Sequence, residues 1–180
     1  MSDHDKLITE IADRLAIQDL IVKYAWARDT TDPDLYREIF ADDATIGMPG
    51  TVFSKNLDEI LAKVANDIIR FNPGRQPGTI SFAIMRHEVT NTLITISGDT
   101  ARSNYYVDTL AYNERGKRPE IIATARNEDE YQRRDGRWWI VRSTLNFGWN
   151  HEEMGRALQV GPFTPPQYRH QSSPPSPGGH

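Results

Sequence analysis

The sequence predicts an α+β fold in which a curved, mostly antiparallel sheet wraps against N-terminal helices. Two observations support this prediction. In the first half of the chain, apolar residues recur at steps of three and four, which is the period of a helix packed on one side. The second half contains long segments rich in β-branched and aromatic residues, separated by short polar turns. Because the helices come first and the strands follow as a meander, we expect neighbouring strands to pair antiparallel.

Local signals mark where the elements begin, bend and end. The apolar stripe from Leu7 to Tyr24 predicts a first helix that ends at Asp29. Asp32 followed by Pro33 is typical of an N-cap and first helical residue. The length of the first strand pattern indicates a bend or bulge near Thr90-Asn91. After the first helix we expect a helix over 33–40, a β-like segment over 45–53, a helix over 57–71, and strands over 79–97, 100–112, 120–133 and 137–149.

Length and composition limit the classes of function. The chain has 180 residues, enough for one domain with one core, and its formal net charge of −4 disfavours nucleic acid as a partner. It contains no cysteine, which excludes disulfides, thiolate nucleophiles and cysteine-based metal sites. No apolar run of about 18 residues and no signal peptide is visible, so we expect no membrane span and a cytoplasmic protein.

The composition changes near residue 161. We expect one domain over 1–160 and a Pro/Ser/Gly-rich tail over 161–180. The end of this tail has too few apolar side chains to offset its ordering entropy, so we expect it to be disordered. The segment 152–168 could pack over a pocket mouth or against a neighbouring subunit.

The residues available for chemistry are His, Asp, Glu, Tyr, Lys and Arg. The sequence has no glycine-rich dinucleotide motif, no P-loop, no zinc-protease motif and no nucleophile elbow, so we expect neither cofactor nor metal. Among the five histidines, His87 alone lies inside a strand pattern, where alternation places it on one face with Met85 and Val89. His87 is either a general base facing an apolar interior or a core histidine satisfied by one partner.

Other candidate site residues also have two interpretations. Asp29, at the end of the first helix, is either a local turn or capping carboxylate or the partner of a histidine. Tyr24 lies on the apolar stripe of that helix and is either a core aromatic residue or a polar residue of the site. Trp26 and Phe147 could line a pocket for substrate, although aromatic residues more often fill a core. Arg126 is a candidate for holding an anion or a leaving group, and its alternative is a solvated strand arginine.

An ordered set of motifs resembles the SnoaL-like domains of the nuclear-transport-factor-like cone-fold superfamily. The motifs are Ile17-Gln-Asp-Leu-Ile-Val-Lys-Tyr24, Asp29-x-x-Asp32, Ile39-Phe-Ala-Asp-Asp-Ala44, Arg86-His87-x-x-Thr90-Asn91, Gly98-Asp99-Thr-Ala101 and Asp129-Glu-Tyr-Gln-Arg-Arg-Asp-Gly136-x-Trp138. The resemblance covers about Asp3 to Trp149. It implies a cone-shaped α+β barrel and a homo-oligomer, either a dimer or a trimer.

The resemblance also implies a catalytic pair. Within the superfamily the chain is similar to lindane dehydrochlorinase, scytalone dehydratase and a bile-acid dehydratase. These relatives place a carboxylate at the end of the first helix beside a strand histidine, and the matching positions are Asp29 and His87. Tyr24 matches a polar catalytic position of the same family.

The sequence departs from these relatives at two positions. Ser143 stands where the dehydrochlorinase has an arginine. The strand over 100–112 has no second histidine like that of scytalone dehydratase, and Tyr105 or Thr109 would occupy its space as a substrate-binding residue. Neither dehydrochlorination nor scytalone is therefore expected to carry over.

Together these observations predict a cofactor-independent lyase acting on a small hydrophobic, aromatic or phenolic compound. In this hypothesis the Asp29 carboxylate accepts from Nδ1–H of His87, so that Nε2 is free to take a proton. Tyr24 donates to a departing hydroxyl in a dehydratase-type elimination, or the same base drives a retro-aldol C–C cleavage. Two alternatives stay open: an isomerase or polyketide-type cyclase using the same pair, and a non-catalytic domain that binds a small ligand.

Overall fold

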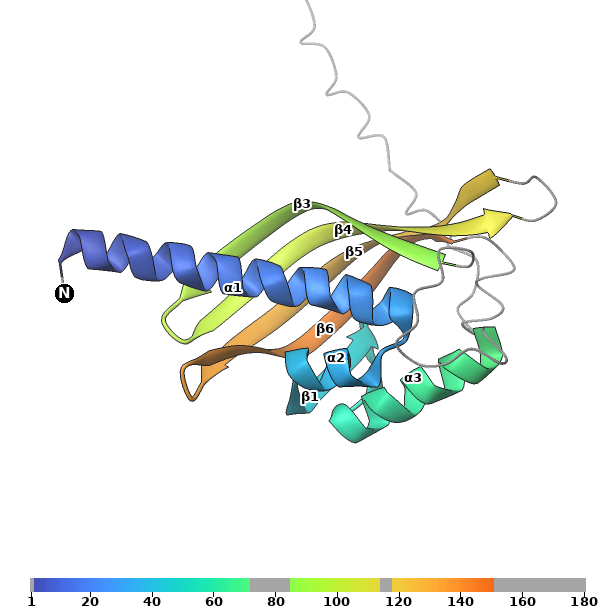
Figure 1. Ribbon diagram of the computed structural model, residues 1–180, viewed down its shortest axis with the longest axis horizontal. Helices are drawn as coiled ribbons and strands as arrows, with labels where there is room; N and C mark the ends of the chain where they lie inside the picture. The colour runs from blue at the N-terminus through green and yellow to red at the C-terminus, as the bar shows by residue number, and fades with distance from the viewer. Residues whose placement is uncertain (1, 72–84, 114–117, 151–180) are drawn as a thin grey trace, which may run out of the picture.

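The computed structural model describes residues 2–71, 85–113 and 118–150 (Figure 1). The elements in these ranges are α1 (Asp3–Thr30), α2 (Pro33–Ile39), β1 (Phe40–Met48), β2 (Thr51–Ser54), α3 (Leu57–Phe71), β3 (Met85–Ser97), β4 (Thr100–Asn113), β5 (Arg118–Arg134) and β6 (Arg137–Asn150). The predicted tail, the segment 152–168 and the part of the predicted strand over 79–84 lie outside the described residues.

The strands form one six-stranded sheet in the order β2-β1-β6-β5-β4-β3. β1 and β6 are parallel, and every other neighbouring pair is antiparallel. α1 packs against β3, β6 and α2, and α3 packs against β1, β2 and α2 (Figure 1). The predicted α+β fold, a curved and mostly antiparallel sheet wrapped against helices, is confirmed.

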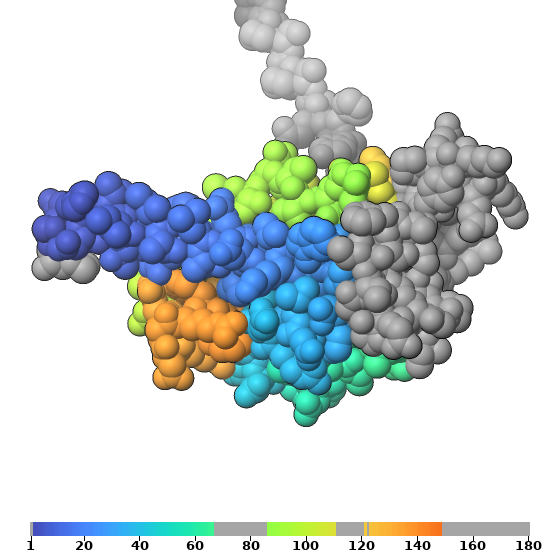
Figure 2. All heavy atoms as spheres, viewed as in Figure 1, coloured from blue at the N-terminus to red at the C-terminus, as the bar shows by residue number. Residues whose placement is uncertain are grey.

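α1 is capped at both ends. Ser2 and Asp5 form a capping box at its start, and Thr31 takes a left-handed conformation after its last residue. The apolar stripe predicted from Leu7 to Tyr24 is buried only from Ile17 onward. Leu7 and the other apolar residues of the first turns are more than half exposed, because this part of α1 projects beyond the sheet (Figure 2).

The second helix begins as predicted but ends one residue earlier. The Asp32 carboxylate accepts from the backbone N–H groups of Asp34 and Leu35, which confirms it as the N-cap. Phe40 belongs to β1 instead of the helix, and its fully buried ring packs edge-on against Tyr24. The β-like segment expected over 45–53 proves to be two strands joined by a turn in which Gly50 has a φ of 78°.

The long strands contain the predicted irregularity. The register between β3 and β4 shifts between Thr90 and Leu93, where Asn91 has a φ of 53°. The β5–β6 turn is formed by Asp135 and Gly136, both at positive φ. These features bend the sheet so that its inner face can curve around α1.

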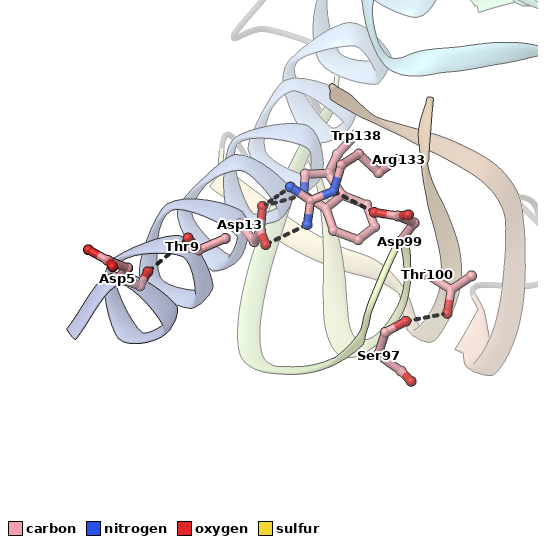
Figure 3. A network of polar contacts seen from close by, with 8 residues as sticks. All are labelled: Asp5, Thr9, Asp13, Ser97, Asp99, Thr100, Arg133 and Trp138. Atoms are coloured by element: carbon pink, nitrogen blue, oxygen red, sulfur yellow. Dashed lines mark hydrogen bonds and ion pairs between the residues drawn. The ribbon is translucent and has the colours of Figure 1, made fainter. Parts of the chain in front are cut away.

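A partly buried polar network joins the N-terminal half of α1 to the sheet near the β3–β4 and β5–β6 turns (Figure 3). Asp13 accepts two hydrogen bonds from the Arg133 guanidinium, at 2.7 and 2.6 Å, and one from the Trp138 indole at 2.9 Å. Arg133 also lies 3.0 Å from the Asp99 carboxylate. Although burial opposes ionisation, the bonds from Arg133 and Trp138 lower the pKa of Asp13.

Replacing Asp13 with alanine is expected to reduce the free energy of unfolding by about 2–4 kcal/mol, because it leaves a partly buried arginine and an indole N–H without their acceptor. Asp43 offers a matched control, since it also holds an arginine through two bonds, at 2.7 and 3.0 Å, but is 67% exposed. Asp43→Ala should cost no more than about 1 kcal/mol. Urea denaturation of both variants tests this difference, and equal losses would contradict it.

Candidate active site

The end of α1 and the beginning of β3 bring Asp29 and His87 together. Oδ1 of Asp29 accepts from the backbone N–H of His87 at 2.9 Å and lies 2.6 Å from Nδ1 of its ring. One carboxylate oxygen therefore fixes both the strand and the imidazole. The His87 side chain is 5% exposed and the Asp29 side chain 17%. The two residues that the sequence analysis paired are adjacent.

The local structure at the end of α1 leaves Asp29 free for this contact. The Thr30 hydroxyl donates to the Trp26 carbonyl at 2.7 Å, and the backbone N–H of Thr31 donates to the Ala27 carbonyl. These bonds satisfy carbonyls of the last turn without an aspartate. Asp29 instead reaches β3, so the alternative interpretation as a local capping carboxylate does not describe its contacts.

The environment of His87 favours the neutral ring. Burial lowers the pKa of His87 to about 4, and the positive charge of Arg28 acts in the same direction, while Asp29 opposes both. The carboxylate can only accept, so Nδ1 carries the ring proton and Nε2 holds a lone pair. Near neutral pH this arrangement leaves Nε2 able to take a proton.

Tyr24 and Arg28 extend the site along α1. Tyr24 is buried, and burial raises the pKa of its hydroxyl, so the phenol stays protonated near neutral pH. The Arg28 guanidinium lies 5.7 Å from the centre of the Tyr24 ring. The charge of Arg28 also lowers the pKa of His87 and of Asp129 on β5. These two ionisable residues therefore lie within the electrostatic reach of one cation.

The inner face of the sheet carries an inner polar cluster, which consists of Ser103, Tyr105, Asn127, Asp129 and Tyr131. The hydroxyls of Tyr105 and Tyr131 donate to Oδ2 of Asp129 at 2.7 and 3.3 Å. Nδ2 of Asn127 donates to the Tyr105 hydroxyl at 3.2 Å, and the hydroxyls of Ser103 and Tyr131 are 2.7 Å apart. Burial raises the pKa of Asp129 to about 6, against the opposing effect of these bonds.

The structure separates the other predicted site residues. Tyr105 is buried in the inner polar cluster, and Phe147 is half-buried opposite Ala125. Arg126 requires a correction, because it lies on the exposed face of β5 and pairs with Glu128.

Two further residues predicted to bind substrate are Trp26 and Met85. Trp26, on α1, is 45% exposed, and its role in binding substrate stays a prediction. The backbone of Met85 begins β3, but its side chain lies outside the described residues.

Sequence reasoning missed Arg28 and the polar residues of β5 and β6. The parity of β5 holds the signal: Ala123, Ala125, Asn127, Asp129 and Tyr131 alternate with exposed or half-buried residues and all face inward. Arg126 has the opposite parity and therefore lies on the outward face of β5. Arg28 gives no comparable signal, since an arginine in the last turn of a helix is also a common partner of the helix dipole.

The described ranges, 2–71, 85–113 and 118–150, contain no group of three His, Cys, Asp or Glu residues close enough to hold a metal ion. In the same ranges, no helix is both long and apolar enough to cross a membrane.

Comparisons with known proteins identify the family and the fold. A family model described as a SnoaL-like domain matches residues 9–144. No curated protein matches the chain. The crystal structure of LinA superposes with a TM-score of 0.65 at 26% identity, covering 92% of this chain and 100% of that one.

Two further solved structures show the same fold. Hexachlorocyclohexane dehydrochlorinase LinA-type3 from Novosphingobium barchaimii has a TM-score of 0.63 at 24% identity, covering 92% of this chain and 100% of its own. An NTF2-like protein with a cystatin-like fold from Novosphingobium aromaticivorans has a TM-score of 0.67 at 18% identity, covering 87% and 94% of the two chains. These likenesses establish the fold.

Proposed function

Because the chain belongs to the family of SnoaL-like domains, we propose that it is an enzyme, a cofactor-independent lyase that uses Asp29 and His87 as a general-base dyad. Its substrate is a small hydrophobic or aromatic compound that carries an acidic C–H bond and a leaving group on the neighbouring carbon. The observation that carries this proposal is the contact of 2.6 Å between Asp29 Oδ1 and His87 Nδ1. It leaves Nε2 as the basic atom of a neutral ring.

The elimination can be followed atom by atom. Nε2 of His87 takes the proton from the substrate carbon, and the electron pair of that C–H bond forms the new double bond. The bond between the neighbouring carbon and its hydroxyl breaks, and the leaving oxygen takes a proton from the Tyr24 hydroxyl to depart as water. The charge of Arg28 stabilises the tyrosinate that this leaves. Transfer of the proton from His87 back to Tyr24 through solvent restores the starting state.

Asp29 supports this reaction in two ways. It holds the ring in the tautomer that exposes Nε2, and it stabilises the imidazolium that forms during proton transfer. The low pKa of His87, about 4, means that the base is present in its active form over the whole neutral range. This pKa already includes the stabilisation of the imidazolium by Asp29, so without the carboxylate the ring would be a weaker base still.

Mass spectrometry on a panel of aromatic β-hydroxy ketones, beginning with the aldol adduct of benzaldehyde and acetone, tests the proposal. Loss of one water molecule, dependent on His87, is the expected result. Cleavage to aldehyde and ketone would identify the retro-aldol form of the lyase. An isomerase would change the structure of a compound at constant mass, and compounds that bind but are all recovered unchanged would indicate a binding domain; either result would overturn the lyase assignment.

A further inference from the structure

We propose that Oδ1 of Asp129, Oδ1 of Asn127 and Oγ of Ser143 form a binding site for a hydroxyl group of the substrate. This inference rests on the proposed function in taking the inner face of the sheet as the substrate site. It adds a chemical requirement: the ligand must carry a hydrogen-bond donor at the end of its apolar body that lies away from His87.

The three atoms share an unusual state. Each is buried, and none makes a hydrogen bond of good geometry in the structure. The Ser143 hydroxyl nevertheless lies close enough to Asp129 and to Tyr24 to lower the pKa of both groups. Asn127 and Ser143 are 0% exposed and Asp129 is 1% exposed. A buried polar atom without a partner is costly, and such atoms are rare in native proteins. Three such atoms on one surface indicate that a ligand group supplies their missing hydrogen bonds.

Strand pairing places the three atoms on one inner surface. Asp129 on β5 pairs directly with Ser143 on β6, and Asn127 is two residues away from Asp129 on the same inward face of β5. Two residues span about 7 Å along a strand. All three side chains can therefore contact one small group or two neighbouring hydroxyls.

The other polar atoms of these residues are already held. Oδ2 of Asp129 accepts from the Tyr105 and Tyr131 hydroxyls, and Nδ2 of Asn127 donates to the Tyr105 hydroxyl. These bonds fix the orientation of the carboxyl and amide groups before any ligand binds. The unpartnered oxygens are thus preorganised, which lowers the entropic cost of binding.

The chemistry of the site selects a neutral donor. Two of the three atoms are carboxyl and amide oxygens, which accept hydrogen bonds, and the third is a hydroxyl that can donate or accept. An anion or a halogen has no hydrogen to offer to the two acceptors. A cation is disfavoured because the positive charge of Arg28 already acts on Asp129. A phenolic or aliphatic hydroxyl satisfies the acceptors without adding charge.

The register also fixes where this hydroxyl lies relative to the base. Asn127 pairs with Tyr105, and the next inward-facing row consists of Val107, Ala125 and Phe147. His87 belongs to the row beyond, where it pairs with Thr109. An apolar row therefore separates the hydroxyl site from His87. The substrate is expected to place an aromatic or aliphatic body on this row, with its hydroxyl at one end and its acidic carbon at the other.

Isothermal titration calorimetry with β-naphthol and its methyl ether tests the hydroxyl site, because the ether has the same aromatic body but no donor. The protein is expected to bind β-naphthol about tenfold more tightly than the ether. Asn127→Leu and Ser143→Ala should each reduce this preference to about threefold or less, while Glu128→Gln, on the exposed side of β5, should leave it unchanged. Equal binding of both compounds, no binding of β-naphthol, or a preference that both inner-face variants retain would overturn the inference.

The same titration on His87→Gln separates this inference from the proposed function. The variant should keep the preference for β-naphthol, since His87 does not contact the three oxygens. A lost preference at Asn127→Leu together with unchanged turnover in His87→Gln would refute the general base and leave the hydroxyl site standing. Lost turnover in His87→Gln, with no preference for β-naphthol in the unmodified protein, would refute the hydroxyl site alone.

Discussion

Replacing His87 with glutamine is expected to lower kcat by about 10²–10⁴-fold, the range that general acid–base catalysis contributes. Glutamine can still donate a hydrogen bond toward Asp29, but its amide has no basic lone pair that could take a proton from carbon. The measurement is turnover of whichever β-hydroxy ketone the protein converts, followed by mass spectrometry. Thermal unfolding of the variant should show that the fold is retained.

His4→Gln is the matched control, since it makes the same chemical change at an exposed residue in the first turn of α1. Its turnover should equal that of the unmodified protein. The acid limb of the pH–rate profile should be centred near pH 4, because kcat/KM reports the pKa of the base in the free protein. A His87→Gln variant with full turnover would show that another group removes the proton.

The pH dependence of stability should reveal two buried groups that act in opposite directions. The pKa of His87 is about 4 in the folded protein, against 6.5 for a histidine in the unfolded chain. Between these two pH values the unfolded chain binds more protons, so acidification destabilises the fold. The pKa of Asp129 is about 6 in the folded protein, against 3.8 for an aspartate in the unfolded chain. Between these two pH values the folded chain binds more protons, so acidification stabilises the fold. Each effect amounts to about 3 kcal/mol between pH 7 and pH 4.

Two variants should separate these effects. Relative to the unmodified protein, the free energy of unfolding of His87→Gln should rise by about 3 kcal/mol from pH 7 to pH 4, because only the stabilising protonation of Asp129 remains. Asp129→Asn should show the reverse, a relative fall of about 3 kcal/mol. Urea denaturation at intervals across this range measures both differences. Parallel curves for all three proteins would mean that neither pKa is displaced by burial.

Sequence alone predicted the elements whose signals are local. The N-cap at Asp32, the third helix over 57–71, the irregularity at Asn91 and the turn at Asp135 each follow from a few neighbouring residues. The end of α2 was predicted wrongly, because an apolar residue such as Phe40 fits the last turn of a helix as well as the first position of a buried strand.

The site was harder to predict because it depends on contacts between distant elements. Asp29 and His87 are 58 residues apart, and their contact follows from the packing of α1 on β3, which residue spacing does not reveal. Only the family resemblance paired them. The choice of Arg126 was wrong for a different reason: Arg126 has the outward parity of β5, whereas Ala123, Ala125 and Tyr131 on the opposite parity mark the inner face.

The proposed reaction depends on a neutral imidazole that is held by Asp29 and offers Nε2 to the substrate. NMR of the His87 ring nitrogens and carbons over a pH titration measures this directly. The proposal predicts a ring protonated on Nδ1 that remains neutral until the pH falls to about 4. A ring that carries its proton on Nε2, or that titrates near 6.5 like an exposed histidine, would contradict the claim on which the proposed chemistry is built.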